Sequence, residues 1–375
     1  MKSIKSIIEQ FNIPGRCIDI QTINTGNINR TYIVSYLMDN GNIKKYIVQK
    51  INTTVFKEPY KLMKNIDGIT KWIEKVSKES NDFKHPFLSL IHTKEDDLLS
   101  VIKDEAGEKL YYRAYNCIEN SISYDGSKDT NVVYNAGQAF GHFQKLLLDY
   151  PTKNIEDTIP DFHNTYKRYL AFLEDLEKDV CNRAKEVSKE IEFIKSNSYL
   201  ASAIVDLLNK SLIPERVIHN DTKVNNVMLD KDTGEYLTVI DLDTVMLGSS
   251  LYDYGDGIRS AAANALEDEK DLEKVWMVNE LFESYTKGYL SEMAPYLTYE
   301  EIKNMGVSIE VITYELALRF LNDYINGDTY FKTNYSKHNL VRTRNQIKLL
   351  NDIKSKKSYI ENYIQDTYTL MLKKK

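Results

Sequence analysis

Two short stretches decide how this chain is interpreted: IHNDTKVNN at residues 218–226 and VIDLDT at residues 239–244. In the first, an Asp is followed by a Lys two positions later and by an Asn five positions later. In the second, another Asp ends an apolar run of the kind that predicts a β-strand. Any one of these residues alone is common in turns and carries no functional signal. The ordered set, divided by a predicted hairpin turn DKDTG at residues 230–234, indicates an active site.

Transfer of a phosphoryl group from a magnesium nucleotide explains this spacing. The transition state is highly charged, so the acceptor hydroxyl must be held in line while cations neutralise the phosphate oxygens. We expect Asp221 to orient the hydroxyl and accept its proton, and Lys223 to reach the transferring phosphate. Asn226 and Asp241 supply the oxygen ligands that Mg²⁺ prefers. For Asp243, direct metal binding and support of its neighbours remain equally open.

These residues predict a kinase that uses ATP as co-substrate and Mg²⁺ as cofactor. His219 stands beside the proposed catalytic residue in the same loop. We expect its ring to hydrogen-bond backbone groups and hold the loop in shape, without transferring a proton.

Composition limits the other classes of function. The 375 residues are enough for two cores, and 42% hydrophobic with 28% charged residues is typical of soluble globular proteins. A net charge of -6, with both signs mixed along the chain, argues against a nucleic-acid partner. Cys17, Cys117 and Cys181 have no metal or disulfide spacing, which fits a reducing compartment. With no signal peptide and no membrane span in the pattern, we expect a cytoplasmic protein, either monomer or homodimer.

The order of the predicted elements indicates the fold class. Strands are expected at 17–24, 31–38 and 44–51, a helix from Pro59 to about 78, and strands at 87–92, 98–103 and 110–115. Helices then follow at 131–149, at 161–195 in two or more pieces, and at 198–211, 256–265, 271–291, 299–326 and 337–372, interrupted only by the hairpin. This order predicts an α+β, protein-kinase-like fold of two lobes. Residues 1–119 would form a small antiparallel β-rich nucleotide-binding lobe with one main helix, and residues 120–375 a larger helical lobe with the acceptor site.

The small lobe should supply the contacts to the nucleotide phosphates. Lys50 ends the third predicted strand, where kinase-like folds place the lysine that pairs with the α and β phosphates. Its carboxylate partner on the next helix could be Glu58, Glu74 or Glu79, and the sequence does not choose. In the first turn, Thr25 and Asn27 flank a glycine, and backbone N–H groups there can close over phosphates.

The catalytic stretch resembles the aminoglycoside phosphotransferase and choline kinase superfamily. Within it, further blocks are similar to the N-acetylhexosamine 1-kinases: QKINTTVFKEPYKLMKNI at 49–66, IDLDT at 240–244, YDYGDGIR at 252–259 and LRFLNDY at 318–324. Lys50 departs from that family, in which we expect an Arg to be common. A Lys keeps the positive charge but not the bidentate contact to phosphate.

The resemblance implies ATP-dependent phosphorylation of the anomeric hydroxyl of N-acetylglucosamine or N-acetylgalactosamine. By position it places the sugar contacts on Asp221, Thr244, Arg319 and Tyr330. Three further residues, Asp253, Asp256 and Arg259, are expected to brace the metal strand through buried ion pairs and helix capping.

Two other interpretations remain. A phosphotransferase could act on another hydroxyl acceptor, namely choline, methylthioribose, homoserine or an aminoglycoside. A catalytically silent nucleotide-binding protein would lack at least one catalytic or metal group, whereas Asp221, Asn226 and Asp241 are all present. The preference between gluco and galacto epimers depends on the placement of one hydroxyl, which the sequence does not determine.

Overall fold

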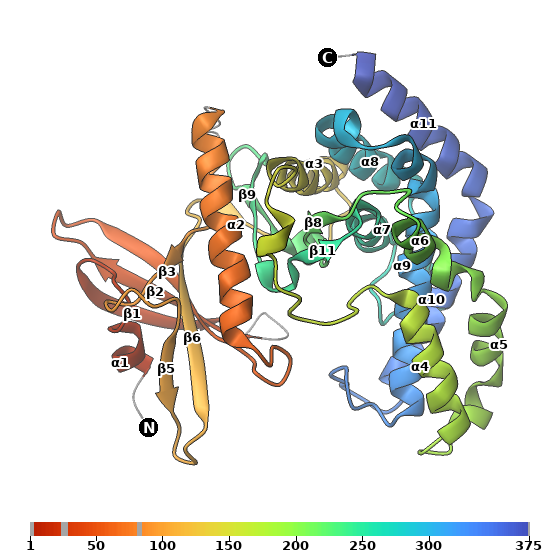
Figure 1. Cartoon of the computed structure of the whole chain (residues 1–375), viewed down its shortest axis with the longest axis horizontal. Coiled ribbons are helices and arrows are strands. Elements are labelled where there is room, and N and C mark those ends of the chain that lie inside the picture. Colours follow the sequence, from red (N-terminus) through yellow and green to blue (C-terminus); the bar gives the residue numbers. More distant parts are fainter. Residues whose placement is uncertain (1–3, 24–28, 81–84, 374–375) are drawn as a thin grey trace.

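Two lobes of different composition make up the computed structural model, which describes residues 4–23, 29–80 and 85–373 (Figure 1). An antiparallel sheet forms the first lobe, and helices form most of the second. This arrangement confirms the predicted α+β, kinase-like fold. None of the described helices is long and apolar enough to cross a membrane.

The sheet of the first lobe has the strand order β1-β2-β3-β6-β4, with β5 also paired to β6. Its strands are β1 (Arg16–Ile23), β2 (Arg30–Leu37), β3 (Ile43–Lys50), β4 (Leu90–Ile91), β5 (Ser100–Lys103) and β6 (Lys109–Asn116). Gly41 has a φ of 84° in the turn between β2 and β3, a conformation that glycine adopts without strain. The three-strand meander predicted from the sequence is therefore confirmed.

The two faces of this sheet have different neighbours. One face packs with α1 (Ile4–Ile8) into a small core that includes Val34 and Val48. Along β3 the side chains alternate between faces, so the neighbours of Val48 in the strand point towards the second lobe instead. The main helix of this lobe, α2 (Pro59–Glu79), begins at Pro59 as predicted and buries its apolar stripe in the large core.

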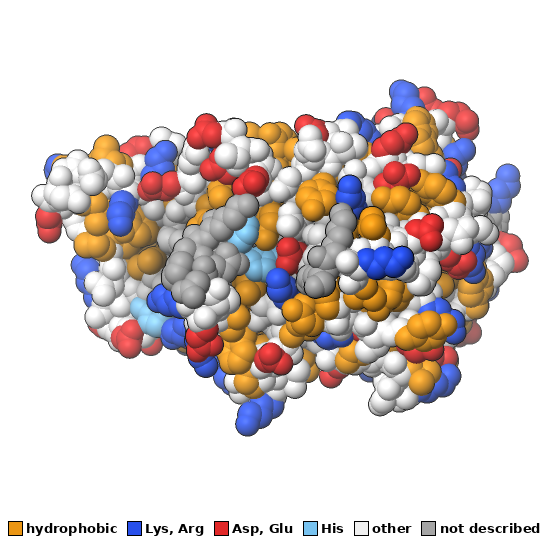
Figure 2. Space-filling view, turned by 90° about the horizontal axis from the view of Figure 1, so that it is seen from above, with side chains coloured by type: hydrophobic (Ala, Val, Ile, Leu, Met, Phe, Trp, Pro, Cys, Tyr) orange, Lys and Arg blue, Asp and Glu red, His pale blue; other side chains and the backbone are white. Residues whose placement is uncertain are grey.

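The second lobe is built around one long buried helix, α9 (Tyr299–Ile325). The other helices are α3 (Thr130–Leu146), α4 (Thr165–Lys178), α5 (Ser188–Ser196), α6 (Tyr199–Asn209), α7 (Ser250–Ala261), α8 (Asn279–Met293), α10 (His338–Ser355) and α11 (Lys357–Lys373). Short 3-10 helices are η1 (Thr152–Asn154), η2 (Ala184–Val187), η3 (Val224–Asn226), η4 (Leu242–Thr244), η5 (Leu272–Lys274) and η6 (Ala294–Tyr296). Charged side chains of both signs are interspersed over the face seen in Figure 2.

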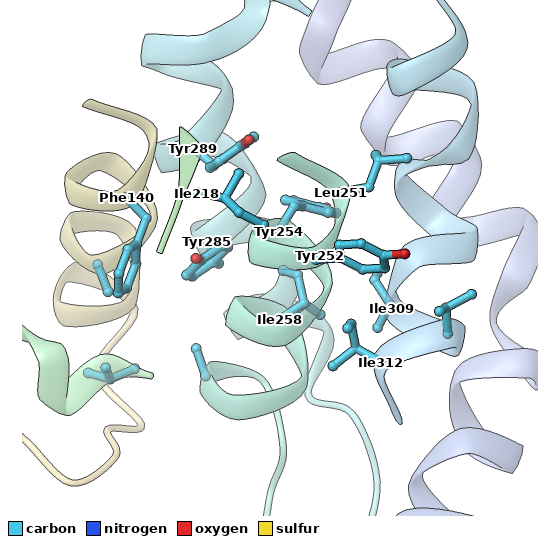
Figure 3. Close-up of a cluster of buried hydrophobic side chains, with 14 of the residues drawn as sticks. Phe140, Ile218, Leu251, Tyr252, Tyr254, Ile258, Tyr285, Tyr289, Ile309 and Ile312 are labelled. Carbon is cyan, nitrogen blue, oxygen red and sulfur yellow. The ribbon is translucent and has the colours of Figure 1, made fainter. Parts of the chain in front are cut away.

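Helix α7 lies in the centre of this lobe, between α8 and α9 (Figure 3). Two glycines explain how it fits there. A Cβ atom at Gly255 would lie 2.5 Å from the carbonyl oxygen of Ser308, and one at Gly257 would lie 1.9 Å from the hydroxyl of Tyr285. Close packing on both sides fixes the position of the polar side chains that α7 carries.

Several boundaries differ from the sequence-based expectation. Helix α7 begins at Ser250, six residues before the predicted start, because Ser249 caps it and its glycines serve close packing. The helix expected at 271–291 is α8, which begins at Asn279, and the one expected at 337–372 is divided at Lys356. Small strands make up the rest: β7 (Ser121–Ile122), β8 (Arg216–Ile218), β9 (Val227–Asp230), β10 (Tyr236–Val239) and β11 (Met246–Gly248). Strands β9 and β10 form the predicted hairpin, whereas β7 and the β8–β11 pair were not predicted.

Candidate active site

Side chains of α7 accept hydrogen bonds from the backbone of the loop that follows β8. Asp253 is fully buried, and its two carboxylate oxygens accept the backbone N–H groups of His219 and Asn220 at 2.8 and 2.7 Å. Gln144 on α3 donates to the same carboxylate at 2.8 Å. One turn further along α7, Asp256 accepts the N–H of Thr222 at 3.1 Å. The central helix of the lobe therefore holds the backbone of the catalytic loop at three residues, His219, Asn220 and Thr222, on both sides of Asp221.

The pair Asp256 and Arg259 completes this support. The two side chains are buried and form an ion pair of 2.9 Å, and Arg259 also reaches Glu267 at 2.9 Å. The predicted buried ion pair is confirmed. The residue it braces is Thr222 of the catalytic loop, however, and not the metal strand, because α7 runs beneath that loop.

His219 connects the catalytic loop to the strand that carries the next functional group. Its ring is completely buried, and its Nε2 atom donates to the carbonyl oxygen of Ile240 at 2.9 Å. In this tautomer, Nδ1 accepts the N–H of Asp221 at 3.3 Å. The predicted supporting role of His219 is confirmed. One side chain thereby fixes the distance between Asp221 and the residue after Ile240, which is Asp241.

The proposed catalytic groups meet at the end of this loop. Lys223 Nζ lies 3.0 Å from Asp221 Oδ1, and Asn226 Nδ2 donates to the backbone oxygen and to Oδ2 of Asp221 at 2.9 and 3.2 Å. The Asp221 carboxylate raises the pKa of Lys223. The Asn226 carbonyl also accepts the N–H of Ile240 at 2.9 Å, which ties the loop to β10. The structure therefore brings Asp221, Lys223 and Asn226 together.

Asp241 follows β10 and takes the left-handed conformation, with a φ of 60°. This conformation is uncommon for residues other than glycine and is concentrated at functional sites. The residue is exposed to the cleft, where the surrounding protein desolvates its carboxylate. Enclosure raises the pKa of Asp241 to about 7, and the nearby carboxylates of Asp243 and Asp221 contribute to the rise. An arrangement of this kind is stabilised by a cation.

These groups line a cleft of about 1060 Å³ between the lobes. Its upper wall comes from the sheet, including Gln49 and Arg113, and its rim from the connection at 116–121. Its floor comes from the second lobe, where Asp221, Lys223, Asn226 and Asp241 all face it. The volume is at the upper end of the range found for small-molecule and cofactor sites.

The donor set suits a hard divalent cation. Because Asn226 uses its NH₂ group to bind Asp221, its amide oxygen is turned away and left free as a ligand. Asp241 offers a carboxylate beside it. Among residues 4–23, 29–80 and 85–373, no three His, Cys, Asp or Glu side chains gather into an all-protein metal cage. Mg²⁺ commonly binds one or two carboxylates and takes its other ligands from phosphates and water.

Two roles were open for Asp243, and both of its carboxylate oxygens already have partners within the protein. It is 3% exposed, and its Oδ1 forms a hydrogen-bonded ion pair with Arg113 of β6. Its Oδ2 accepts the side-chain N–H of Asn29 at 2.6 Å. The Asn29 oxygen in turn accepts the N–H of Asn52 at 3.0 Å. Asp243 thus links the sheet of the first lobe to the metal strand, which favours the supporting role.

Lys50 does not join these groups. The residues of β3 that face the cleft are Ile43, Lys45, Ile47 and Gln49, and Lys50 lies on the opposite face with Val48. A strand alternates its side chains, so the expected position was displaced by one residue. The three candidate partners of Lys50, namely Glu58, Glu74 and Glu79, instead pair with lysines of α2 itself. Thr25 and Asn27, also expected at the phosphates, lie outside the described residues.

Thr244 stands close to the catalytic loop but is bonded to the backbone. Its hydroxyl donates to the carbonyl oxygen of His219 at 2.7 Å, and its own carbonyl accepts the side-chain N–H of Asn220 at 2.8 Å. An acceptor molecule could therefore meet only the lone pairs of this hydroxyl. A contact of Thr244 with the sugar stays a prediction.

Arg319 and Tyr330 lie together, as the resemblance implied. The Arg319 Nη2 atom is 3.5 Å from the Tyr330 hydroxyl, and its guanidinium lies 5.7 and 5.4 Å from the ring centroids of Phe162 and Phe331. Among the described residues, no hydrogen bond or ion pair joins Arg319 or Tyr330 to Asp221.

A buried carboxylate lies next to Arg319. Glu315 is fully buried beneath it, and burial alone would raise its pKa. Its contacts with the ring of His163 and the guanidinium groups of Arg168 and Arg319 instead lower the pKa to about 2. One ionised carboxylate therefore faces two arginines. The backbone of Tyr330 is held nearby by the buried Asp323, which accepts its N–H at 2.8 Å.

Two residues of the site were missed in the sequence. Arg113 is a charged residue at a cleft-facing position, and its neighbours in the middle of the strand, from Leu110 to Tyr115, are apolar or aromatic; this break in the pattern was the available signal. Asn65 is a polar residue in the apolar stripe of α2. Its amide donates to the backbone of Glu156 at 2.8 Å and of Val245 at 3.3 Å, and it accepts the N–H of Glu156 at 2.8 Å. It fastens α2 to the second lobe beside η4.

Comparison with known proteins gives a consistent result. A family model described as "Phosphotransferase enzyme family" matches residues 19–274, which is more than half of the chain. A microcompartment-associated aminopropanol kinase has a similar structure, with a TM-score of 0.63 and 13% identity, over 96% of this chain and 98% of that one. Choline kinase from Cryptosporidium parvum Iowa II gives a TM-score of 0.54 and 15% identity over 98% and 99%.

A third similar structure is the amicoumacin kinase hAmiN, which was determined in complex with AMP-PNP, Ca²⁺ and Ami. Its TM-score is 0.57 at 13% identity, over 94% of this chain and 92% of that one. At these identities the three structures show a shared fold alone.

Proposed function

This chain belongs to the phosphotransferase enzyme family, and we propose from this that it transfers the γ-phosphoryl group of ATP to a hydroxyl of a small molecule. The observation that carries the proposal is the convergence of Asp221, Lys223, Asn226 and Asp241 on one cleft between the lobes. A positioned base, a cation and two metal-binding oxygens are the groups that phosphoryl transfer requires.

Each residue then has a distinct task. Asp221 accepts a hydrogen bond from the attacking hydroxyl and takes its proton as the new ester forms. Lys223, held 3.0 Å from Asp221, balances charge on the transferring phosphoryl group. Asn226 and Asp241 would hold Mg²⁺, with Asp243 keeping its neighbours in place. The bound cation supplies neutralisation of the phosphate oxygens.

We assign the two lobes different tasks in this reaction. Residues 1–119 provide the sheet that covers the nucleotide, and residues 120–375 provide the catalytic loop and the acceptor site. The connection at 116–121 borders the cleft, where the base of the nucleotide would lie.

For the acceptor we propose the anomeric hydroxyl of an N-acetylhexosamine. The support is the set of sequence blocks similar to the N-acetylhexosamine 1-kinases, together with Arg319 and Tyr330, which lie side by side with hydrogen-bonding groups suited to ring hydroxyls and an acetamido group. The guanidinium groups of Arg168 and Arg319 are both near the buried carboxylate of Glu315, at 3.8 Å. This contact holds the Arg319 side chain in place for hydrogen bonding to a neutral sugar.

A coupled assay of ATP consumption over a panel of acceptors tests this proposal. The panel contains N-acetylglucosamine, N-acetylgalactosamine, choline, methylthioribose, homoserine and kanamycin, with Asp221→Asn protein as the control for background hydrolysis. We expect consumption with the N-acetylhexosamines, and phosphorus NMR should locate the new ester at the anomeric carbon. Turnover of choline or kanamycin alone would keep the phosphotransferase and refute the sugar. No turnover with any acceptor and no ATP binding would refute both.

A further inference from the structure

The first lobe should supply a cation to the nucleotide phosphates, and strand β3 offers none at the catalytic end of the cleft. In the strand β3, the residue nearest the catalytic end of the cleft is Gln49, which is neutral. Lys50 faces away from the cleft. In the sheet it lies opposite Arg30 of β2 and Tyr112 of β6. Lys45 does face the cleft but lies at its rim, where its carbonyl accepts the N–H of Cys117. A polyphosphate bound at the metal site needs a cation above it.

Arg113 stands at the required position. In the pairing of β3 with β6 it lies directly opposite Gln49, and its Nε atom donates to the Gln49 amide oxygen at 3.0 Å. Its Nη1 atom binds Asp243. The side chain is 1% exposed and lines the cleft. Two of the three guanidinium nitrogens are therefore hydrogen-bonded: Nε to the sheet of the first lobe and Nη1 to Asp243 of the second lobe.

The third nitrogen of this guanidinium is available. No described residue accepts a hydrogen bond from Arg113 Nη2, although the fork geometry of the group fixes where its two N–H bonds point. The Arg113 guanidinium also stays positively charged. Burial on its own would lower the pKa of Arg113, but the carboxylates of Asp243 and Asp241 raise it further than burial lowers it. Arg113 is thus a fixed, permanently charged donor at the inner end of the cleft.

We propose that Arg113, and not Lys50, is the cation that binds the nucleotide phosphates in this protein. The inference rests on the proposed function, because it assigns a contact within the same nucleotide site. Gln49 and Asp243 hold the guanidinium in place, and Nη2 donates to a phosphate oxygen. The same ion pair turns Asp243 away from the metal, so Asp241 is left as the carboxylate that faces the cation.

The test compares two matched variants, Arg113→Met and Lys50→Met, each of which removes one cation and keeps an unbranched side chain. Binding of adenosine, ADP and ATP with Mg²⁺ is measured by calorimetry without any acceptor. We expect Arg113→Met to weaken ATP and ADP binding about tenfold to a hundredfold while adenosine binding changes less than about twofold. Lys50→Met should leave all three affinities within about twofold of the unmodified protein.

The dependence on phosphate separates a contact from a structural effect. General damage to the cleft would weaken adenosine and ATP alike, and that result would overturn the proposal. So would a loss of ATP affinity in Lys50→Met with Arg113→Met unaffected. If Arg113→Met does not fold, because it leaves Asp243 buried and unpaired, Arg113→Lys takes its place. The lysine keeps the charge but cannot contact Gln49, Asp243 and a phosphate together, so ATP affinity should still fall more than adenosine affinity.

Failure of this inference can be distinguished from failure of the proposed function. If the unmodified protein binds no adenine nucleotide, the proposed function fails and the inference fails with it. If the unmodified protein binds ATP and its affinity is insensitive to Arg113, only the inference fails.

Discussion

Replacement of Asp253 by Asn isolates the role of α7 in building the catalytic loop. The Asp253 carboxylate accepts three N–H groups at 2.7–2.8 Å, from the buried residues His219, Asn220 and Gln144. An Asn at position 253 has one side-chain oxygen, so it can accept only the hydrogen bonds that now reach one of the two carboxylate oxygens. Its NH₂ group would then face at least one backbone N–H.

The expected cost follows from this count. A hydrogen bond to a charged group contributes about 1.5–3 kcal/mol, and a buried donor left unsatisfied adds a penalty. We therefore expect Asp253→Asn to lower the free energy of unfolding by about 2–4 kcal/mol. The loop it releases carries Asp221, and a displacement of about 1 Å in a positioning group can lower kcat about a hundredfold. The affinity for ATP should be retained, because the other residues that line the cleft keep their own hydrogen bonds.

A matched control separates loop geometry from stability. Asp323 is also a buried carboxylate that accepts backbone N–H groups, those of Thr329, Tyr330 and Phe331 at 2.8–2.9 Å, but it does not touch the catalytic loop. Asp323→Asn should cost similar stability in urea unfolding, keep kcat and raise the KM of the acceptor. If Asp253→Asn retains normal kcat, or if both variants lose kcat equally, α7 does not position the catalytic loop as we infer.

Three further predictions concern the site directly. Asp221→Asn should abolish phosphoryl transfer in the coupled assay and leave the ATP dissociation constant nearly unchanged, since a positioning base acts mainly in the transition state; near-normal turnover contradicts this. Arg319→Ala should raise the KM of the sugar much more than that of ATP in steady-state kinetics, and equal effects would count against a sugar contact. The pKa of about 7 for Asp241 in the metal-free protein means that Mg²⁺ must displace a proton below pH 7. Mg²⁺ affinity should therefore fall as the pH drops from 7 to 5, with proton release in calorimetry that Asp241→Asn removes; a release that survives this substitution would contradict the assignment.

Much of the site could be predicted because its residues are close in sequence. Asp221, Lys223 and Asn226 belong to a single loop, and the hairpin that follows fixes where Asp241 returns. Local turn chemistry and strand patterning were enough to place these groups. The fold class followed from the same source, since the three-strand meander and the long helices have strong periodic patterns.

Lys50 shows where such reasoning stops. The end of β3 was located to within one residue, yet that one residue decides whether a side chain faces the cleft or the small core behind it. Arg113 was missed for a related reason. Its function depends on pairing across strands 64 residues apart and on Asp243, 130 residues away, and no local pattern encodes either contact.

Helix α7 is a third example. Gly255 and Gly257 weakened the helical pattern and delayed its predicted start, because glycine has a low intrinsic preference for helices. Their purpose is visible only in the packed structure, where Ser308 and Tyr285 leave no space for a side chain. The two glycines that weakened the sequence-based prediction of a helix are therefore the residues that let α7 pack where Asp253 reaches the catalytic loop.

The central claim is that Asp221, Asn226 and Asp241 act together on a metal-bound nucleotide in the cleft between the lobes. A crystal structure of this chain with Mn²⁺ and a non-hydrolysable ATP analogue, phased to show the anomalous signal of the cation, tests it most directly. We predict the cation bound by Asn226 and Asp241 and the terminal phosphate facing Asp221. A nucleotide bound elsewhere, or a cation that contacts neither Asn226 nor Asp241, would contradict the account.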